Sequence, residues 1–423
     1  VVFKLRPGTK FHNGRELVAQ DFVFSMSRFA HPKTGSTQHF FFDRVAGYAE
    51  LRSGAAQTLS GVRAVDTKTL EVQLTKPFAE FPAIMAHAAA GTAIPQEEVA
   101  KDPAAFALKP VCTGQYLVAE PWVRGSQIKL SLTRGKESIK TIIVQSVADA
   151  KTGYKLLEAD LVQVADVPVG KLILARKVKG RLSTGANGLI SYIGFPVTKP
   201  PYDNVELRKA LTASTDRKGI NRTLLAGSRL VPEGIFPPSS GFRAPCAVFD
   251  AKKALAESAV DPSTLKPTVY FNQAGGHEKW LQRVTEDWKK QLGIEATLKP
   301  DEWKKYLDFL VQPGADGPFR LAWAVKYPSP EAIVDAVFEA GSPDNFMRYS
   351  SPSFEALVTQ ARATVDDKTR RALYEKAHEV LCNELPMIPM WFGQNNVAFG
   401  PGLTAARRLD AFGDPILGAL RSP

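Results

Sequence analysis

The most constraining run of this sequence begins at Tyr192, where a strand, a turn and a helix follow one another. Its apolar first part predicts a buried strand. The adjacent Pro200 and Pro201 end that strand, and the Asp-Asn pair just after them is typical of a helix start. Leu207 and Leu211 stand four residues apart, so they share one face of the helix that follows. A strand joined to a helix in this way predicts a mixed α/β fold.

Length and composition are those of a large globular protein. With 423 residues, 44% hydrophobic and 23% charged, the chain can build two or three cores. The longest apolar stretches, near 81–94 and 385–392, are interrupted by prolines and are shorter than the roughly 20 residues of a membrane span. The sequence opens directly on a strand, without a signal peptide or lipid-anchor cysteine, so we expect a mature or trimmed chain.

The charge balance is basic, with 54 Lys and Arg against 43 Asp and Glu and a formal net charge of +11. The basic residues are scattered and are not interleaved with aromatic ones, so no nucleic-acid partner is expected. Cys112, Cys246 and Cys382 lie far apart without a C-x-x-C motif, which gives no support to a zinc ribbon or a redox motif. One disulfide with one free thiol, or three free thiols, remain open.

Strand and helix patterns alternate along the rest of the chain. An alternating opening segment, 1–5, precedes a helix pattern at 19–29 and a hairpin pattern at 61–74. In the second half, a strand at 268–271 precedes an amphipathic helix that Gly293 ends, and a strand at 294–298 follows. Two further helix patterns lead to Pro386, which is expected to close the last one.

Several motifs together resemble family 5 of the extracellular solute-binding proteins, which includes oligopeptide-, dipeptide- and nickel-binding proteins of bacterial ABC importers. The run from Tyr192 to Arg217 is similar to the central signature of that family. The opening F-x-L-R-x-G-x-x-F-x-x-G pattern from Phe3, followed by A-x-D-F-x-x-S from Ala19, is also similar. The segment from Pro110 resembles the family's P-V-G-T-G-P-Y element, with cysteine and glutamine as departures.

The resemblance implies an α/β clamshell of the type II periplasmic binding proteins with an extra lobe. We expect a small extra lobe at 1–108, a first lobe at 109–198 plus 396–423, and a second lobe at 199–395. Family members carry additional N-terminal strands in the first lobe that have no counterpart here, so that lobe is expected to be incomplete. Either the sequence omits these strands or the protein is a natural reduction, and omission is favoured because half a lobe would leave unpaired sheet edges. Lobe crossings near Pro200 and near Asn395 are the expected hinge.

The implied function is capture of a peptide or peptide-like small molecule in a cleft between lobes and delivery to the membrane permease of an ABC importer. The resemblance implies an extracytoplasmic monomer without cofactor or metal and without catalysis. It is expected in the periplasm, or as a cell-surface lipoprotein of a Gram-positive bacterium. The alternative is an enzyme or biosynthetic accessory protein that has kept this fold. A metal or metal-chelate receptor, as in the nickel branch, is a third interpretation that no histidine motif supports.

Two aromatic segments resemble the parts of the oligopeptide-binding proteins that line the ligand cleft. By this resemblance Trp303 borders a side-chain pocket, and the backbone near Trp323 and Ala324 pairs with an extended peptide. The competing interpretation is that both tryptophans are core residues. The complete set of expected ligand-binding residues is Tyr192, Trp303, Arg320, Trp323, Ala324, Lys326 and Tyr327.

Lys326 reverses a charge. The peptide-binding branch has an aspartate at this place, which pairs with the ligand's α-amino group. At ~4 Å and an effective dielectric of about 20, two unit charges interact by about 4 kcal/mol, so a lysine disfavours an ammonium and favours a carboxylate or phosphate. Arg320 could add a bidentate donor. Alternatively, Lys326 points into solvent.

The residues themselves give little support to a catalytic or metal site. The sequence contains no G-x-S-x-G, G-x-G-x-x-G, Walker A or H-E-x-x-H motif. Ser263 and Lys266 have the spacing of a β-lactamase element, but the serine leads into a strand and not into a helix. His378 and Cys382 stand four apart on a predicted helix and could share a metal, although burial in the core is the favoured interpretation.

Overall fold

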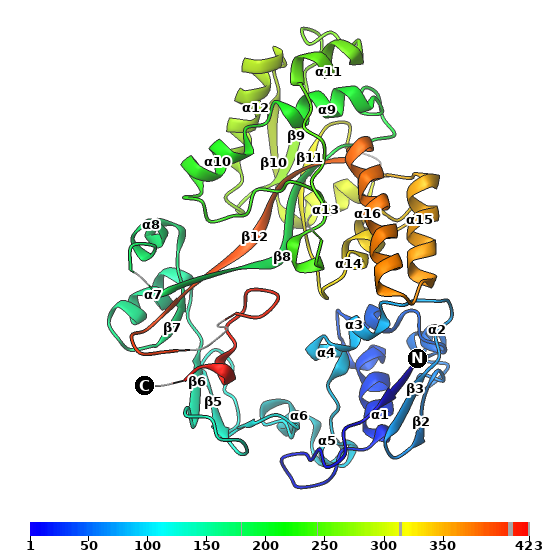
Figure 1. The fold of residues 1–423 in the computed structure, drawn as a ribbon, viewed down its shortest axis with the longest axis vertical. Helices are drawn as coiled ribbons and strands as arrows, with labels where there is room; N and C mark the ends of the chain where they lie inside the picture. The colour runs from blue at the N-terminus through cyan, green and yellow to red at the C-terminus, as the bar shows by residue number, and fades with distance from the viewer. Residues whose placement is uncertain (179, 243, 313–314, 405–408, 422–423) are drawn as a thin grey trace. The chain divides into compact units, whose positions relative to one another are not determined.

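The computed structural model describes residues 1–178, 180–242, 244–312, 315–404 and 409–421 (Figure 1). Its described residues form two compact units, one of 1–163, 400–404 and 415–421 and the other from the ranges Val164–Phe399 and Leu409–Asp414. The expected division into three lobes stays a prediction. Within the described ranges, no helix is long and apolar enough to cross a membrane.

The first unit opens with a three-stranded antiparallel sheet in the order β1-β3-β2. Its strands are β1 (Val2–Lys4), β2 (Val62–Asp66) and β3 (Thr69–Val72). The hairpin of β2 and β3 and the helix α1 (Ala19–Ala30) confirm the patterns seen in the sequence. The helix begins as expected from its apolar spacing, and its buried face packs beside this sheet.

A second three-stranded antiparallel sheet belongs to the same unit, in the order β4-β5-β6. It contains β4 (Tyr116–Val118), β5 (Gln127–Leu132) and β6 (Thr141–Gln145). The remaining helical segments of the unit are η1 (Pro32–Thr34), η2 (His39–Phe42), α2 (Tyr48–Ser53), α3 (Phe81–Met85), α4 (Ala88–Gly91), α5 (Gln96–Lys101), α6 (Pro103–Leu108), α7 (Ala150–Glu158) and η6 (Leu417–Ala419).

The second unit is built on a six-stranded mixed sheet in the order β10-β9-β11-β8-β12-β7 (Figure 1). Two long antiparallel strands, β8 and β12, are its spine, and β9 and β10 run parallel at one edge. The strands are β7 (Val164–Asp166), β8 (Leu182–Gly194), β9 (Thr268–Asn272), β10 (Thr297–Asp301), β11 (Phe319–Ala324) and β12 (Met387–Phe399).

Helices cover this sheet. Those of the unit are η3 (Val169–Lys171), α8 (Leu172–Ala175), α9 (Val205–Ala213), α10 (Arg217–Leu224), η4 (Pro238–Ser240), α11 (Ala251–Ser258), α12 (Glu278–Leu292), α13 (Trp303–Val311), α14 (Glu331–Ile333), the π-helical turn η5 (Val334–Phe338), α15 (Pro352–Ala363) and α16 (Asp367–Glu384). The main core joins α9, α11 and α12 to the sheet and includes Ile193, Phe271 and Trp288.

The strand, turn and helix predicted from the central run are present. The side chain of Asn204 accepts hydrogen bonds from the backbone N–H groups of Glu206 and Leu207, at 3.0 and 3.3 Å, and so caps α9. Leu207 and Leu211 are both fully buried. The pattern around Pro200 therefore specified both the strand end and the helix start.

One element boundary differs from the sequence expectation. Strand β10 begins at Thr297 and not at Ile294, because Ile294 is fully buried and its N–H bonds to the carbonyl of Trp288 at the end of α12. Helix α16 ends at Glu384, directly before Leu385 and Pro386, as expected. Leu385, its C-cap, adopts a left-handed conformation with φ 40°.

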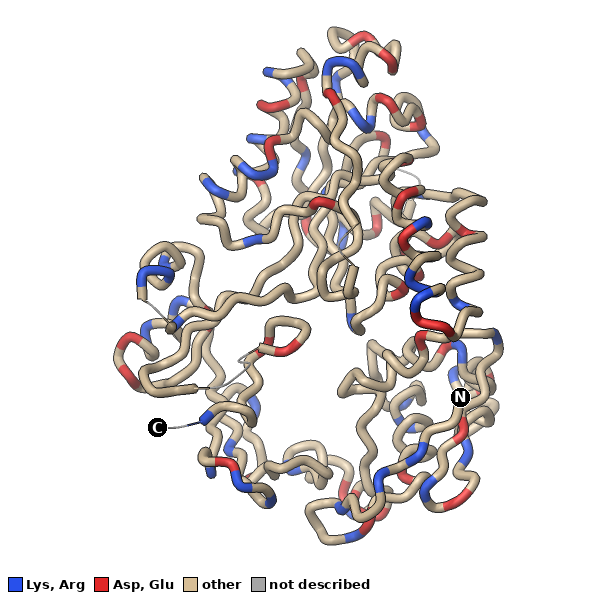
Figure 2. Tube along the Cα trace, viewed as in Figure 1, with Lys and Arg blue, Asp and Glu red and all other residues tan. Residues whose placement is uncertain are grey.

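The charged residues are distributed as the sequence suggested. Blue and red segments are scattered over the trace, without one dominant basic stripe (Figure 2). One buried network stands out, in which Glu331 is fully buried and pairs with Arg362 at 2.6 Å. Burial opposes the charge of Arg362, but Glu331 and Glu339 together raise its pKa above the usual value.

Candidate ligand-binding site

The outer edge of β11 leaves backbone groups open. The N–H of Val325 donates to the carbonyl of Gly188 at 3.0 Å, so the odd-numbered residues of β11 carry the hydrogen bonds to β8. The backbone groups of Ala322 and Ala324 therefore point away from β8. On that side β9 pairs with β11 only at Phe319, so the later part of β11 is an exposed sheet edge.

The helix α13, which is bonded to β11, begins with an exposed tryptophan. Trp303 is the first residue of α13 and is 48% exposed. Its ring lies 6.4 Å from the ring of Tyr306, centroid to centroid. The Tyr306 hydroxyl in turn donates to the carbonyl oxygen of Arg320 at 2.6 Å and to that of Tyr270 at 3.3 Å. Tyr306 thus fixes the position of α13, and with it Trp303, relative to β11.

Arg320 is held inside the protein with one group unsatisfied. Its Nη1 donates to Asn272 Oδ1 at 3.1 Å, whereas its buried Nε has no hydrogen-bond partner among the described residues. Burial lowers the pKa of Arg320 to about 10, against the opposing effect of Tyr306 and Tyr192. Unsatisfied buried donors are uncommon and often mark the place of a water or ligand.

Trp323 and Ala324 are both half-buried. The Trp323 indole N–H donates to the carbonyl oxygen of Ala332 at 2.8 Å, so its ring is anchored to the start of α14. This contact gives the tryptophan a structural role whether or not a ligand touches it. Ala324 contributes a backbone position on the open edge.

Lys326 lies just beyond β11 and is half-buried. Among the described residues, no carboxylate lies within ion-pair distance of it. Tyr327 and Tyr192, by contrast, are buried, at 5% and 1% exposure, and burial raises the pKa of Tyr192. Both tyrosines are therefore core residues in this structure, and their contact with a ligand stays a prediction. No contact joins Arg320 to Lys326, and their joint use in binding stays a prediction.

Sequence reasoning missed three residues of this site. Tyr306, Asn272 and His277 were not among the expected ligand-binding residues, although Tyr306 and Asn272 hold Arg320 through its backbone and side chain. Burial, with a smaller effect of Arg320, lowers the pKa of His277 to about 4. The only sequence signal for Tyr306 is its place one turn after Trp303 on the same helix.

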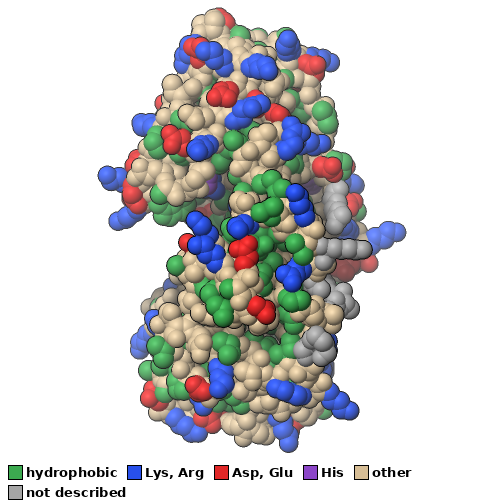
Figure 3. Space-filling model, turned by 90° about the vertical axis from the view of Figure 1, so that its left-hand side faces the viewer, with side chains coloured by type: hydrophobic (Ala, Val, Ile, Leu, Met, Phe, Trp, Pro, Cys, Tyr) green, Lys and Arg blue, Asp and Glu red, His purple; other side chains and the backbone are tan. Residues whose placement is uncertain are grey.

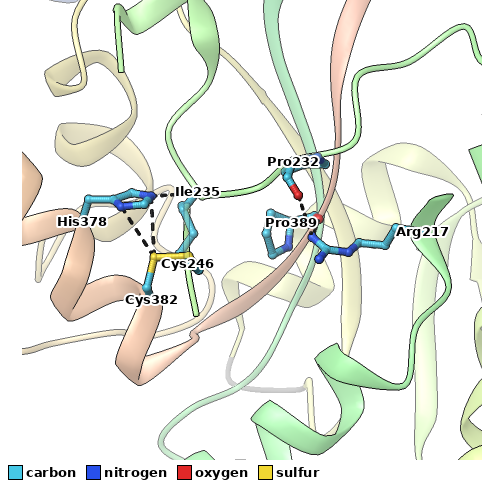
Figure 4. The surroundings of a disulfide bond; sticks show 7 residues. All are labelled: Arg217, Pro232, Ile235, Cys246, His378, Cys382 and Pro389. Carbon is cyan, nitrogen blue, oxygen red and sulfur yellow. Dashed lines mark hydrogen bonds between the residues drawn. A yellow bond between two sulfur atoms is a disulfide. The ribbon is translucent and has the colours of Figure 1, made fainter. Parts of the chain in front are cut away.

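The favoured interpretation of His378 and Cys382 as buried core residues is confirmed. Cys382 forms a disulfide with Cys246, His378 is 2% exposed, and Cys112 is a free thiol (Figure 4). His378 Nε2 accepts the N–H of Ile235 at 2.9 Å, and burial lowers its pKa to about 4. Of the two cysteine states left open, the structure has one disulfide and one free thiol.

The side chains of Cys246, His378 and Cys382 are close enough to hold a metal, since their ligand atoms lie within 4.8 Å of one another. In the disulfide, however, the two sulfur atoms are bonded to each other, and one imidazole nitrogen is already used by Ile235 (Figure 4). The cluster is therefore a structural tie between α16 and the loop before α11. Arg217 adds a second tie beside it, donating to the carbonyls of Pro232 and Pro389.

The serine and lysine with β-lactamase spacing do not form a nucleophile pair. Ser263 lies in a turn and donates through its Oγ to Asp261 at 2.9 Å, while Lys266 pairs with Glu295 at 3.3 Å. Each side chain has a different partner, so the two do not act on one another.

Comparison with known proteins decides the family. The profile of bacterial extracellular solute-binding proteins, family 5 Middle, matches residues 1–345. The chain belongs to this family. The suspected resemblance is thereby confirmed, and so is the role that the family name states, binding of a solute outside the cytoplasm.

Relatives of family 5 match most of the chain. The "Probable deoxycholate-binding periplasmic protein YgiS" of Escherichia coli K12 is 28% identical over 417 residues, covering 92% of this chain and 76% of that protein. The periplasmic oligopeptide-binding protein OppA of the same organism is 26% identical over 421 residues, covering 93% and 76%. The unliganded open form of MppA, a periplasmic murein tripeptide binding protein, has a TM-score of 0.88 at 23% identity and covers 100% of this chain and 85% of that one. This likeness confirms the predicted fold class.

Proposed function

We propose that this family 5 protein binds a peptide or peptide-like molecule along the open edge of β11 and delivers it to the membrane permease of an ABC importer. The observation behind this proposal is that Ala322 and Ala324 turn their backbone donors and acceptors to a side on which no strand of the described residues pairs with them. An extended ligand can join such an edge as an additional strand. Main-chain hydrogen bonds of this kind give affinity while reading the side chains of the ligand loosely.

The aromatic residues beside the edge support a ligand with side chains. An exposed tryptophan such as Trp303 offers a large apolar surface that a ligand side chain can cover. Among the relatives, OppA is named for oligopeptides and MppA for a murein tripeptide. These names favour a peptide-like ligand over the alternative of an enzyme or biosynthetic accessory protein.

An anionic group on the ligand is the second part of the proposal. Lys326 is half-buried without a carboxylate nearby in the described structure, and Arg320 keeps an unsatisfied Nε. A carboxylate or phosphate of the ligand would pair with Lys326, and a second polar group could bond to Arg320, because charge-assisted hydrogen bonds are strong. One relative, YgiS, is named as a probable deoxycholate-binding protein, so not every relative is named for a peptide.

The cellular setting follows from the same proposal. The protein works outside the cytoplasm as a monomer, in the periplasm or as a lipoprotein on the surface of a Gram-positive bacterium. Its permease partner recognises the liganded form. Native mass spectrometry of the purified protein would give both the oligomeric state and the mass of any co-purified ligand.

The decisive experiment is a charge reversal at Lys326. Lys326→Asp should weaken the binding of an anionic ligand by more than about 1.4 kcal/mol, a factor of ten in affinity. It should improve the binding of simple peptides with a free ammonium group. Calorimetry with the co-purified ligand and a mixture of short peptides measures both effects. Lys290→Asp, an exposed lysine on α12, is the matched control. If wild type and Lys326→Asp bind these ligands with equal affinity, Lys326 points into solvent. An ordinary peptide is then the favoured ligand.

A further inference from the structure

A second hollow lies between α8 and α10, and none of its lining residues belongs to the β11 site. Its volume is about 380 Å³, and its walls include Ile173, Arg176, Lys218, Arg222 and Val231. The lining thus combines three cationic side chains with aliphatic ones and contains no carboxylate. All of its charged lining residues are therefore basic.

The three cations converge because of local structure. Lys218 and Arg222 stand four apart on α10, so they project from the same helix face. Arg176 follows α8, and its two terminal nitrogens donate to the carbonyls of Ala226 and Gly227 at 2.9 and 2.7 Å. These bonds hold the guanidinium at the rim of the hollow, close to the end of α10.

No acid balances this charge. Within the described part of the chain, none of Arg176, Lys218 and Arg222 has a carboxylate within ion-pair distance. Three like charges gathered at one hollow repel one another, and the repulsion is relieved when an anion enters. An arginine fork also matches the geometry of phosphate and carboxylate oxygens.

Exposed aliphatic side chains adjoin the cations. Ile173 and Leu174 on α8 are 60% and 56% exposed, and Val178 just after it is 46% exposed. Figure 3 views the side of the molecule on which α8 lies in Figure 1, and there hydrophobic side chains stand next to Lys and Arg side chains. Basic residues beside exposed aliphatic ones are typical of surfaces that bind amphipathic anions or anionic lipid.

We propose that the hollow between α8 and α10 binds the phosphate or carboxylate head of an amphipathic molecule, whose apolar part covers Ile173 and Leu174. Lys218 and Arg222 hold the head group, and Arg176, whose terminal nitrogens already bond to Ala226 and Gly227, adds positive charge at the rim. A free amphiphile and a lipid in a bilayer offer the same chemistry, so the experiment has one arm for each source. The proposal is independent of the solute bound along β11.

The first arm uses dodecyl phosphate below its micelle concentration in isothermal titration calorimetry. The wild-type protein should bind it in a saturable 1:1 manner, and inorganic phosphate at least about tenfold more weakly, because the apolar contact is then missing. The double variant Lys218→Glu, Arg222→Glu should lose at least about tenfold in affinity. The matched control, Lys252→Glu with Lys290→Glu, makes the same charge change on exposed residues of α11 and α12 and should bind like wild type.

Two more variants separate this site from others. Ile173→Ser should lower the affinity for dodecyl phosphate by a few fold and leave the affinity for inorganic phosphate unchanged, since it alters only apolar surface. Trp303→Ala should leave both unchanged. Because Lys218, Arg222 and Ile173 are exposed, thermal unfolding of their variants is expected to match wild type.

The second arm is cosedimentation with vesicles of phosphatidylglycerol or phosphatidylcholine. Binding to the anionic vesicles alone, lost in the Lys218→Glu, Arg222→Glu variant, identifies bilayer lipid as the source. Dodecyl phosphate binding without vesicle binding identifies a free amphiphile. If the double variant binds dodecyl phosphate as tightly as wild type, or if Trp303→Ala alone abolishes it, the proposed site is wrong.

Discussion

Two places in the second unit bury ionisable side chains, and they differ in how far the protein satisfies the hydrogen bonds of these groups. Beside the disulfide, His378 is 2% exposed and accepts the N–H of Ile235 at 2.9 Å, so the protein itself satisfies the imidazole. At the β11 edge, Arg320 keeps a buried Nε without a partner among described residues, and Ala322 and Ala324 turn backbone groups outward. The comparison separates a structural cluster, whose polar groups are satisfied within the protein, from the edge that we propose as the ligand-binding site.

The largest expected effect falls on the structural side of this comparison. The disulfide closes a loop with a sequence separation of 136. Replacing Cys246 and Cys382 together by alanine should lower the free energy of unfolding by about 3 kcal/mol, because the unfolded chain regains freedom. Urea denaturation measures the loss, and a thiol assay on the unfolded wild type should find Cys112 alone. Cys112→Ser is the control for the loss of a single thiol. If the double variant unfolds at the same urea concentration as wild type, the disulfide does not stabilise the fold.

The next effect is a pH dependence at the same cluster. Burial lowers the pKa of His378 to about 4 from the usual 6.5. The unfolded chain therefore takes up a proton below pH 6.5 that the folded protein refuses, so stability is complete above that value and is lost as the pH falls toward 4. At pH 5 the loss from this group is about 2 kcal/mol.

His378→Gln tests this assignment, since glutamine can still accept the N–H of Ile235 through its amide oxygen. The variant should lose less stability than wild type between pH 7.5 and pH 5, as followed by urea denaturation at each pH. His277, whose pKa burial also lowers to about 4, contributes in the same direction, so His277→Gln is a second comparison. Parallel profiles of wild type and His378→Gln would show that His378 does not carry the effect.

The sequence predicted the elements that local patterns control. The cap at Asn204 and the buried pair Leu207 and Leu211 are properties of a few adjacent residues, and both were correct. The boundary at Ile294 was wrong because the chain after a helix first completes the helix end, which an apolar pattern does not reveal. Short-range patterns therefore fixed where elements occur better than where they begin.

The site depended on long-range information. Cys246 and Cys382 are partners only because the loop before α11 reaches α16, which no spacing along the chain expresses. The open edge exists because β9 pairs with β11 at Phe319 alone, and the order of strands in a sheet is a tertiary property. The family resemblance supplied Trp303, but Tyr306 and its bonds to β11 came from the structure.

On the ligand side, the larger effect is expected at Trp303. Because its side chain is 48% exposed, Trp303→Ala should change the free energy of unfolding by less than about 0.5 kcal/mol. Loss of the stacking surface should weaken the co-purified ligand by about tenfold, or 1.4 kcal/mol. Calorimetry gives the affinity, and Trp303→Phe, which keeps an aromatic ring, should recover most of it. If both variants bind like wild type, the tryptophan lies outside the ligand contact.

The smallest and sharpest effect concerns the backbone of β11 itself. Ala324→Pro removes an N–H that points away from β8 and leaves the β8 ladder complete. Proline is tolerated on sheet edges, so the fold should keep most of its stability. If a ligand accepts a hydrogen bond from this N–H, the variant should lose roughly 0.5–1.5 kcal/mol of binding free energy, the usual net value of such a bond.

Val325→Pro is the matched control one residue further on. Its N–H makes the 3.0 Å bond to Gly188, so proline there should lower stability in urea denaturation. Proline at Ala324 should therefore lower ligand affinity, whereas proline at Val325 should lower the stability of the fold. The two differ because the backbone groups of successive strand residues point toward opposite neighbours. An Ala324→Pro protein that is as destabilised as Val325→Pro, or that binds the ligand as wild type does, would mean that no ligand strand pairs with this edge.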